Sequence, residues 1–133
     1  MRVATACWRR DTTPSGRRAV DIRLKRVYET SSAGDGTRLL VDRLWPRGLA
    51  KESLAGVPWL KELAPSTELR QWFGHEPAKW KEFQRRYFAE LDANPQVIAE
   101  LRRHLGKHRT TLLYAARDEM HNNAVALREY ILR

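Results

Sequence analysis

Three segments of the chain have the hydrophobic pattern of short β-strands. Residues 22–28 (IRLKRVY) alternate between apolar and basic side chains, as a strand with one buried face does. Residues 39–43 and 110–116 are mostly apolar runs, which are typical of strands buried on both faces. The serine- and glycine-containing residues 31–36 predict a loop between the first two strands.

Helical periodicity fills the region between the second and third strands. Ser66 predicts an N-cap for a helix over residues 67–73, and Gly74 predicts its end. A second helix is expected after Pro77, where apolar residues recur at spacings of three, four and four: Trp80, Phe83, Tyr87 and Leu91. Pro95 opens a third helix, expected to end at Gly106, with the apolar residues Ile98, Leu101 and Leu105.

A last helix is predicted from about Asp118 to Leu132, with Asp118 as its N-cap. Its buried stripe is expected to contain Met120, Ala124, Leu127 and Ile131. Strands that alternate with helices predict an α/β fold, namely a small, mainly parallel sheet with helices packed on its faces. We expect the apolar last strand to be central and parallel to residues 39–43.

Polar residues that could form a site follow two of the predicted strands. In open α/β sheets, ligands bind outside the carboxyl ends of the strands. The second strand is followed by Asp42, Arg43, Trp45 and Arg47, and the third ends with Tyr114, Arg117, Asp118 and His121. We therefore expect these eight residues to meet at one edge of the sheet.

Composition indicates a single domain over residues 21–133, preceded by a basic tail. The 133 residues contain 25 Lys and Arg against 16 Asp and Glu, a net charge of +9. Residues 1–20 hold five arginines and one aspartate, which leaves +5 on the rest, and we expect this tail to be disordered. The single cysteine, Cys7, excludes an internal disulfide and favours a cytoplasmic location. No apolar run is long enough to span a membrane.

Arg43, Arg47 and Arg117 predict a site for a small anionic molecule. A guanidinium group binds phosphate or carboxylate through two parallel hydrogen bonds, and the start of the last helix would add backbone N–H donors. Asp118 competes for those donors if it is the N-cap. The alternative is that Asp42, Arg43, Arg117 and Asp118 form a structural ion-pair network.

His121 is the candidate general acid or base, because histidine titrates near neutral pH and Asp118 or Asp42 could orient its ring. The alternative is an ordinary surface histidine. Tyr114 is a candidate for a hydrogen bond to the ligand or to Asp42, and a buried tyrosine with a satisfied hydroxyl is the alternative. Trp45 either stacks on a ligand or covers the edge of the sheet.

No metal or cofactor is expected. The four histidines, His75, His104, His108 and His121, have no compact ligand spacing, and no cysteine lies near them. His75 could face the same cleft as His121, or it could be a loop histidine packed beside aromatic residues. Trp59, Trp72 and Trp80 are expected to belong to the core.

A function from a different class is non-specific association with nucleic acid. It would use the basic tail and the basic residues within 79–86 to bind phosphates. No helix-turn-helix, zinc finger or aromatic RNA-binding strand motif is present, so base readout is not expected. The alternative for the basic residues is a solvated helix face. These patterns do not distinguish an enzyme from a binding protein, and nothing in them indicates an oligomeric state.

Four ordered stretches have a recognisable pattern: VDRLWPRG at 41–48, WLKELAPS at 59–66, LRQWFGH at 69–75 and LLYAARD at 112–118. With them, the chain from about Ile22 to Leu132 resembles the YeaO-like branch of the family of domain of unknown function 488 (DUF488). The other branches carry a cysteine on the last strand, where this chain has Tyr114, and a Cys-His-Arg cluster near the position of His121. The resemblance therefore implies no thiol chemistry here, and Cys7 lies too far upstream to substitute.

Overall fold

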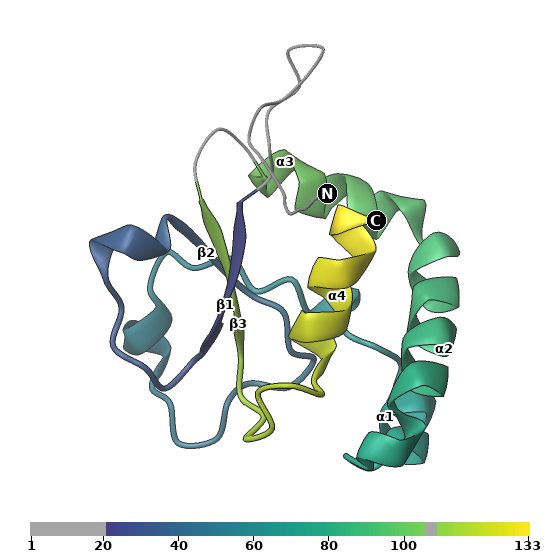
Figure 1. Ribbon diagram of the computed structural model, residues 1–133. Helices are drawn as coiled ribbons and strands as arrows, with labels where there is room; N and C mark the ends of the chain where they lie inside the picture. The colour runs from purple at the N-terminus through teal and green to yellow at the C-terminus, as the bar shows by residue number, and fades with distance from the viewer. Residues whose placement is uncertain (1–20, 106–108) are drawn as a thin grey trace, which may run out of the picture.

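The computed structural model describes residues 21–105 and 109–133. Three parallel strands form one sheet: β1 (Ile22–Arg26), β2 (Thr37–Leu40) and β3 (Thr110–Tyr114), in the order β1-β3-β2 (Figure 1). The predicted α/β class and the central, parallel last strand are therefore confirmed. The predictions made for residues 1–20, Gly106 and His108 lie outside the described residues.

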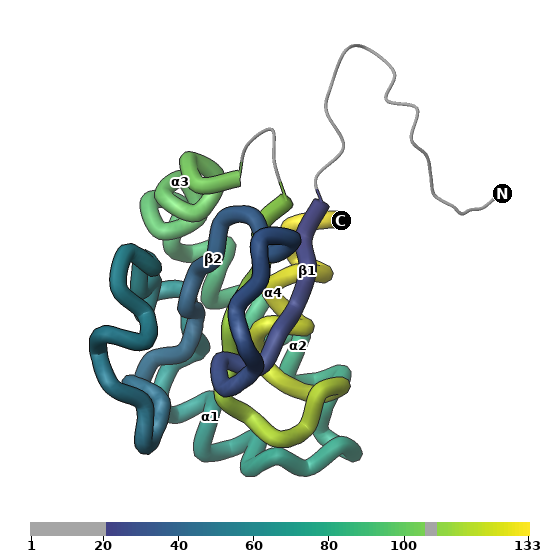
Figure 2. Tube along the Cα trace, turned by 90° about the vertical axis from the view of Figure 1, so that its left-hand side faces the viewer, coloured from purple at the N-terminus to yellow at the C-terminus, as the bar shows by residue number. Residues whose placement is uncertain are grey.

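The sheet has helices on one face and loops on the other. The helices are α1 (Thr67–Phe73), α2 (Trp80–Asp92), α3 (Pro95–His104) and α4 (Asn123–Leu132). α4 packs on β1 and β3, and α2 packs against the other three helices (Figure 1). The opposite face, which is turned toward the viewer in Figure 2, carries the short 3-10 helices η2 (Ala33–Asp35) and η3 (Lys51–Leu54).

Two apolar cores lie on the two faces of the sheet. Successive side chains of a strand point to opposite faces, so neighbouring leucines enter different cores. Leu39 and Leu112 belong to the large core beneath the helices, whereas Leu40 and Leu113 belong to the small core beneath the loops. All five residues of β3 are buried, which accounts for its apolar sequence.

The boundaries of α1 follow local sequence signals, as predicted. The Ser66 hydroxyl accepts a hydrogen bond from the Leu69 N–H at 3.1 Å, and Gly74 ends the helix in the left-handed conformation at φ 54°. Glu90 of α2 accepts hydrogen bonds from the backbone N–H and the hydroxyl of Ser66, at 2.9 and 2.6 Å. This contact attaches the start of α1 to α2.

The prediction for the start of the last helix was wrong. α4 begins at Asn123, and its N-cap is Asn122, whose side chain accepts from the Val125 N–H at 3.0 Å. Asp118 stabilises a turn before the helix instead, because it accepts hydrogen bonds from backbone N–H groups two and three residues later. Met120 lies in this turn and is 70% exposed, so it is not part of the buried stripe.

All three strand predictions also need correction at their ends. β1 ends at Arg26, β2 runs from Thr37 to Leu40 and β3 ends at Tyr114, although the backbone N–H of Val41 still donates to the Leu113 carbonyl at 3.2 Å. Trp59 was expected in the core, but it is 37% exposed because its indole N–H reaches the carbonyl of Asp42 at 2.7 Å.

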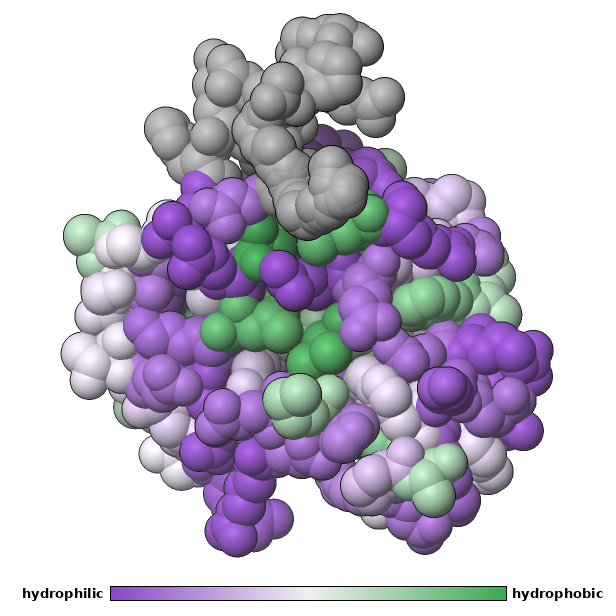
Figure 3. Space-filling model, viewed as in Figure 1, coloured by the Kyte–Doolittle hydropathy of each residue, from purple (hydrophilic) through white to green (hydrophobic). Residues whose placement is uncertain are grey.

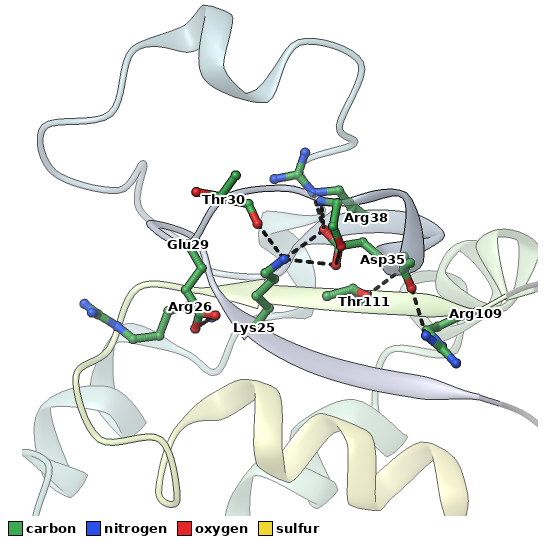
Figure 4. Close-up of polar contacts among 10 residues, drawn as sticks. Lys25, Arg26, Glu29, Thr30, Asp35, Arg38, Arg109 and Thr111 are labelled. Atoms are coloured by element: carbon green, nitrogen blue, oxygen red, sulfur yellow. Dashed lines mark hydrogen bonds and ion pairs between the residues drawn. The ribbon is translucent and has the colours of Figure 1, made fainter.

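The face of the sheet opposite the four α-helices contains an ion cluster around the buried Asp35, which we call the Asp35 cluster: Lys25, Ser32, Asp35, Arg38 and Thr111 (Figure 4). The Lys25 ammonium lies 3.0 Å from a carboxylate oxygen of Asp35 and donates to the Thr30 carbonyl at 2.7 Å. Thr111 donates to the Asp35 carbonyl at 2.7 Å. The cluster therefore joins all three strands to η2.

The surface in the view of Figure 3 is mainly hydrophilic, with apolar residues gathered in a short band near its centre. Among the helices that the structure describes, none is both long enough and apolar enough to cross a membrane.

Candidate functional site

A cavity of about 830 Å³ opens at the carboxyl edge of the sheet, at the lower end of the sheet in Figure 1. It lies between α1 and the loops that follow β2 and β3. Seven of the eight residues expected at this edge line it: Asp42, Arg43, Trp45, Arg47, Arg117, Asp118 and His121. The eighth, Tyr114, is buried in the large core and is not among the lining residues.

Asp42 joins the ends of the two strands beside the cavity. Its carboxylate accepts a hydrogen bond from the backbone N–H of Ala115 at 2.9 Å, and the side chain of Asn123 donates to the neighbouring Val41 carbonyl at 2.9 Å. Burial raises the pKa of Asp42 above its ordinary value, although the Ala115 N–H and the nearby Arg70 oppose this rise. A partly desolvated carboxyl group therefore lies at the cavity wall.

Four arginines line the cavity at two levels. Arg43 and Arg70 are half-buried, and their Nε atoms are buried without a hydrogen-bond partner among the described residues. Arg47 and Arg117 are exposed at the rim. Within residues 21–105 and 109–133, none of the four lies in an ion pair with a carboxylate.

The structural ion-pair network considered from the sequence is thus not seen among the described residues. Arg43 donates instead to the Ala64 carbonyl at 3.3 Å, and Asp42 accepts from the Ala115 backbone. The exposed Arg117 forms no ion pair with Asp118, whose carboxylate faces His121.

Asp118 and His121 form a pair on the cavity wall. The Nδ1 atom of His121 lies 3.0 Å from Asp118 Oδ2, and the other carboxylate oxygen accepts from the backbone N–H groups of Met120 and His121. The Met120 N–H and the contacts with His121 hold the pKa of Asp118 below its ordinary value. The His121 ring also packs edge-on against Trp80, with centroids 5.3 Å apart, so its orientation is fixed from two sides.

Trp45 has structural contacts that account for its position. Its indole N–H donates to the Leu49 carbonyl at 2.7 Å, and its ring packs edge-on against Trp59 at 5.3 Å. Trp45 also packs against the small core. It therefore covers the edge of the sheet while one part of it lines the cavity.

The loop after β3 is held by Arg26 at the end of β1. The Arg26 guanidinium donates to the carbonyls of Ala116 and Ala115, at 3.0 and 3.1 Å. On the opposite rim, the hydroxyl of Tyr28 donates to the Arg47 carbonyl at 2.8 Å. These contacts fix the backbone on both sides of the cavity, so the two rim arginines project from anchored segments.

Sequence reasoning missed Arg70, which lies on α1 one residue after the buried Leu69. The only signal for it was its place in the LRQWFGH stretch at 69–75, which carries the family resemblance. His75 at the end of that stretch does line the cavity, with a left-handed backbone at φ 59° and its ring 6.2 Å from that of Phe73.

The inner wall of the cavity is apolar. Phe73 and Phe83 line it and stack on each other with ring centroids 4.5 Å apart. Among residues 21–105 and 109–133, no group of three or more His, Cys, Asp or Glu side chains could hold a metal ion. The arrangement thus combines apolar walls, unpaired arginines and one histidine–aspartate pair.

Comparisons with known proteins agree with the resemblance seen in the sequence. The uncharacterized protein YeaO of Escherichia coli K12 is 42% identical over 112 residues, which cover 84% of this chain and 97% of YeaO. The uncharacterized proteins Mb3100c of Mycobacterium bovis and Rv3073c of Mycobacterium tuberculosis H37Rv are each 39% identical over 114 residues, covering 86% of this chain and 96% of theirs. No solved structure matches the chain significantly.

A family model described as "Inactive DUF488-N3 subclade" matches residues 21–133, which is the whole of the region assigned to the domain. The chain therefore belongs to the DUF488 family, among its YeaO-like members.

Proposed function

We propose that this protein binds a small anionic molecule, bearing a phosphate or carboxylate group, in the cavity at the carboxyl edge of its sheet. The observation that carries the proposal is the set of four arginines around one cavity, none of which forms an ion pair within the described residues. The lining contains these four arginines against two aspartates, which gives it an excess of positive charge.

The partial burial of Arg43 and Arg70 makes the binding of an anion energetically favourable. A guanidinium that is partly removed from water loses hydration free energy, and a carboxylate partner normally offsets this loss. Arg43 and Arg70 are half-buried and have no such partner among the described residues. A bound anion would provide the missing charge and accept the free N–H donors.

A binding role has more support than a catalytic one. The subclade that matches this chain is described as inactive. The second candidate, an enzyme acting on the same anion with His121 as general acid or base, is favoured by the 3.0 Å contact between His121 and Asp118. Incubation of the protein with the bound anion separates the two, since an enzyme converts the anion to a product and loses that turnover in H121Q, whereas a binding protein leaves the anion unchanged.

The nucleic-acid alternative has less support, because three of the four basic residues within 79–86 are engaged within the protein. Arg85 and Arg86 both pair with Glu82, at 2.5 and 2.8 Å. The Lys79 ammonium donates to the Trp72 carbonyl at 2.9 Å. A direct measurement of duplex DNA binding by the full chain at low salt tests this alternative, and salt-sensitive binding that survives loss of the cavity arginines would favour it.

The anion proposal is tested by thermal unfolding of the full chain with a panel of phosphorylated and carboxylated metabolites. At a ligand concentration 100 times the Kd, binding stabilises the folded state by about 2.7 kcal/mol. We expect R43Q and R70Q to lose this stabilisation and R103Q to keep it, since Arg103 is an exposed arginine on α3 away from the cavity. The proposal is wrong if no member of the panel stabilises the protein, or if both cavity variants respond like R103Q.

A further inference from the structure

The geometry points to a more specific ligand, an organic phosphate monoester whose phosphate lies against Arg43 and Arg70 and whose apolar body lies against the exposed lining residues Tyr28 and Leu44. This inference rests on the proposed anion-binding function and narrows it to one chemical class.

The inner arginines, Arg43 and Arg70, have many N–H donors without a hydrogen-bond acceptor among the described residues. A guanidinium has five N–H donors. Arg43 donates one to the Ala64 carbonyl at 3.3 Å, and Arg70 makes only a long 3.5 Å contact with the Thr67 hydroxyl. Most donors of both groups are therefore free within the described residues.

Arg43 and Arg70 both lie near Asp42. Arg43 follows Asp42 directly in the chain, and Arg70 lies close enough to Asp42 to lower the pKa of that carboxyl group. Arg43 is also hydrogen-bonded to Ala64, which lies just before the Ser66 cap of α1. Both guanidinium groups thus belong to the same end of the cavity.

Carboxylates and phosphates differ in how many arginines they can bind at once. One guanidinium fork already matches the two oxygens of a carboxylate, so a carboxylate leaves the second arginine without an anionic partner. A phosphate monoester has three terminal oxygens and carries about −1.5 to −2 charges at pH 7, as a phosphorylated side chain does. It can therefore accept hydrogen bonds from both Arg43 and Arg70. A phosphate diester has only two terminal oxygens and one charge, and fits less well.

The cavity has room for more than a phosphate group. Pockets of roughly 300–1,000 Å³ hold organic molecules of drug size, so the cavity of about 830 Å³ is far larger than an inorganic phosphate needs. Phe73 and Phe83 form its inner wall but are already buried, whereas Tyr28 and Leu44 also line it and are 44% and 66% exposed. An apolar ligand body would cover the exposed surfaces of Tyr28 and Leu44.

The test uses isothermal titration of the full chain with four probes: phenyl phosphate, inorganic phosphate, benzoate and phenol. We expect phenyl phosphate to bind at least about tenfold more tightly than inorganic phosphate or benzoate, and phenol to show no measurable binding. R43Q and R70Q should each weaken phenyl phosphate binding about tenfold or more, and R103Q should leave it unchanged.

Two further variants keep the result interpretable. R70K retains the charge but not the fork, so its affinity for phenyl phosphate should lie between those of the wild type and R70Q. L44N changes an exposed side chain and should weaken phenyl phosphate about threefold without affecting inorganic phosphate. Circular dichroism of each variant verifies that it is folded.

The outcomes separate this inference from the proposed function. If benzoate binds as tightly as phenyl phosphate, the phosphate class is wrong but anion binding stands. If inorganic phosphate equals phenyl phosphate and L44N has no effect, the apolar body is wrong. If none of the probes binds, the inference is overturned, while the metabolite panel still decides on anion binding by itself.

Discussion

The Asp35 cluster and the carboxyl-edge cavity use the same residue types in opposite ways. In the cluster, Asp35 accepts hydrogen bonds from the Ser32 backbone and hydroxyl and from Lys25, so its charge is compensated and its pKa is lowered (Figure 4). At the cavity, Asp42 is hydrogen-bonded to one backbone N–H, and burial raises its pKa. Hydrogen-bond partners outweigh desolvation at Asp35, whereas desolvation outweighs the partners at Asp42.

The basic side chains of the two regions differ in how much of their charge is available to a ligand. Lys25 is bonded to both carboxylate oxygens of Asp35 and to the Thr30 carbonyl, so little of its charge is left for a ligand. Arg43 and Arg70 have no carboxylate partner among the described residues. We therefore expect mutations in the Asp35 cluster to change the free energy of unfolding, and mutations of the cavity arginines to change the affinity for a ligand.

The largest effect is expected at Gly36, directly after Asp35. Gly36 has φ 67°, and a Cβ there would lie 2.0 Å from the Arg109 carbonyl oxygen. We expect G36A to reduce the free energy of unfolding by more than about 3 kcal/mol. The matched control is Gly48 at the cavity, with φ 78° and no atom within 4 Å, where G48A should cost only about 1 kcal/mol. Urea unfolding measures both, and equal losses would contradict the contrast between the two regions.

The next effect is expected for D35N, which leaves the half-buried Lys25 without its anion. We expect a loss of about 2–3 kcal/mol at pH 7. Because the folded pKa of Asp35 is lowered, its stabilisation is present above the unfolded value of about 3.9 and disappears as the pH falls through the folded value. Urea unfolding of D35N and wild type should therefore converge only in acid. A difference that does not depend on pH would show that the charge is not the cause.

A smaller effect of opposite sign is expected for D42N. The folded pKa of Asp42 is raised, so ionisation above about pH 4 opposes folding. Asparagine can still accept from Ala115, and we expect a gain of up to about 1 kcal/mol at pH 7 that fades as the pH falls to 4. Loss of this negative charge should also strengthen binding of phenyl phosphate, which calorimetry measures. Destabilisation like that of D35N would remove the distinction between the two aspartates.

The smallest effect on stability is expected for R117Q. Arg117 is exposed and forms no ion pair among the described residues, so stability should change by less than about 0.5 kcal/mol. Affinity for phenyl phosphate should fall by about two- to fivefold through loss of rim charge, less than in R43Q. A loss of stability without a loss of affinity would make Arg117 structural.

The fold was predictable where local chemistry decides the structure. Ser66 and Gly74 determine the two ends of α1 through their own side-chain and backbone geometry, so the helix was predicted correctly from the sequence. The start of α4 was misplaced because Asp118 and Asn122 are both good N-caps. The choice between them depends on tertiary contacts, among them the hydrogen bond from Asn123 to the Val41 carbonyl 82 residues away.

The site was predictable as a location, because parallel strands place their carboxyl ends at one edge. Arg70 was not predictable in the same way, since its place at the cavity depends on how α1 is docked by the contact between Ser66 and Glu90, 24 residues apart. The Asp35 cluster was not predicted, because a segment with glycine and serine indicates a turn but does not indicate that Asp35 in this turn will contact Lys25. Neither hydrophobic periodicity nor capping residues indicate which elements far apart in the chain will pack against each other.

The central position of β3 has a consequence for synthesis of the chain. β1 and β2 do not pair with each other, and each pairs only with β3, which begins at Thr110. Neither strand can join a sheet until β3 has left the ribosome, so both emerge with apolar side chains and with unpaired backbone edges. The domain should therefore acquire its sheet late and in one step, and a nascent chain arrested before β3 should depend on chaperones.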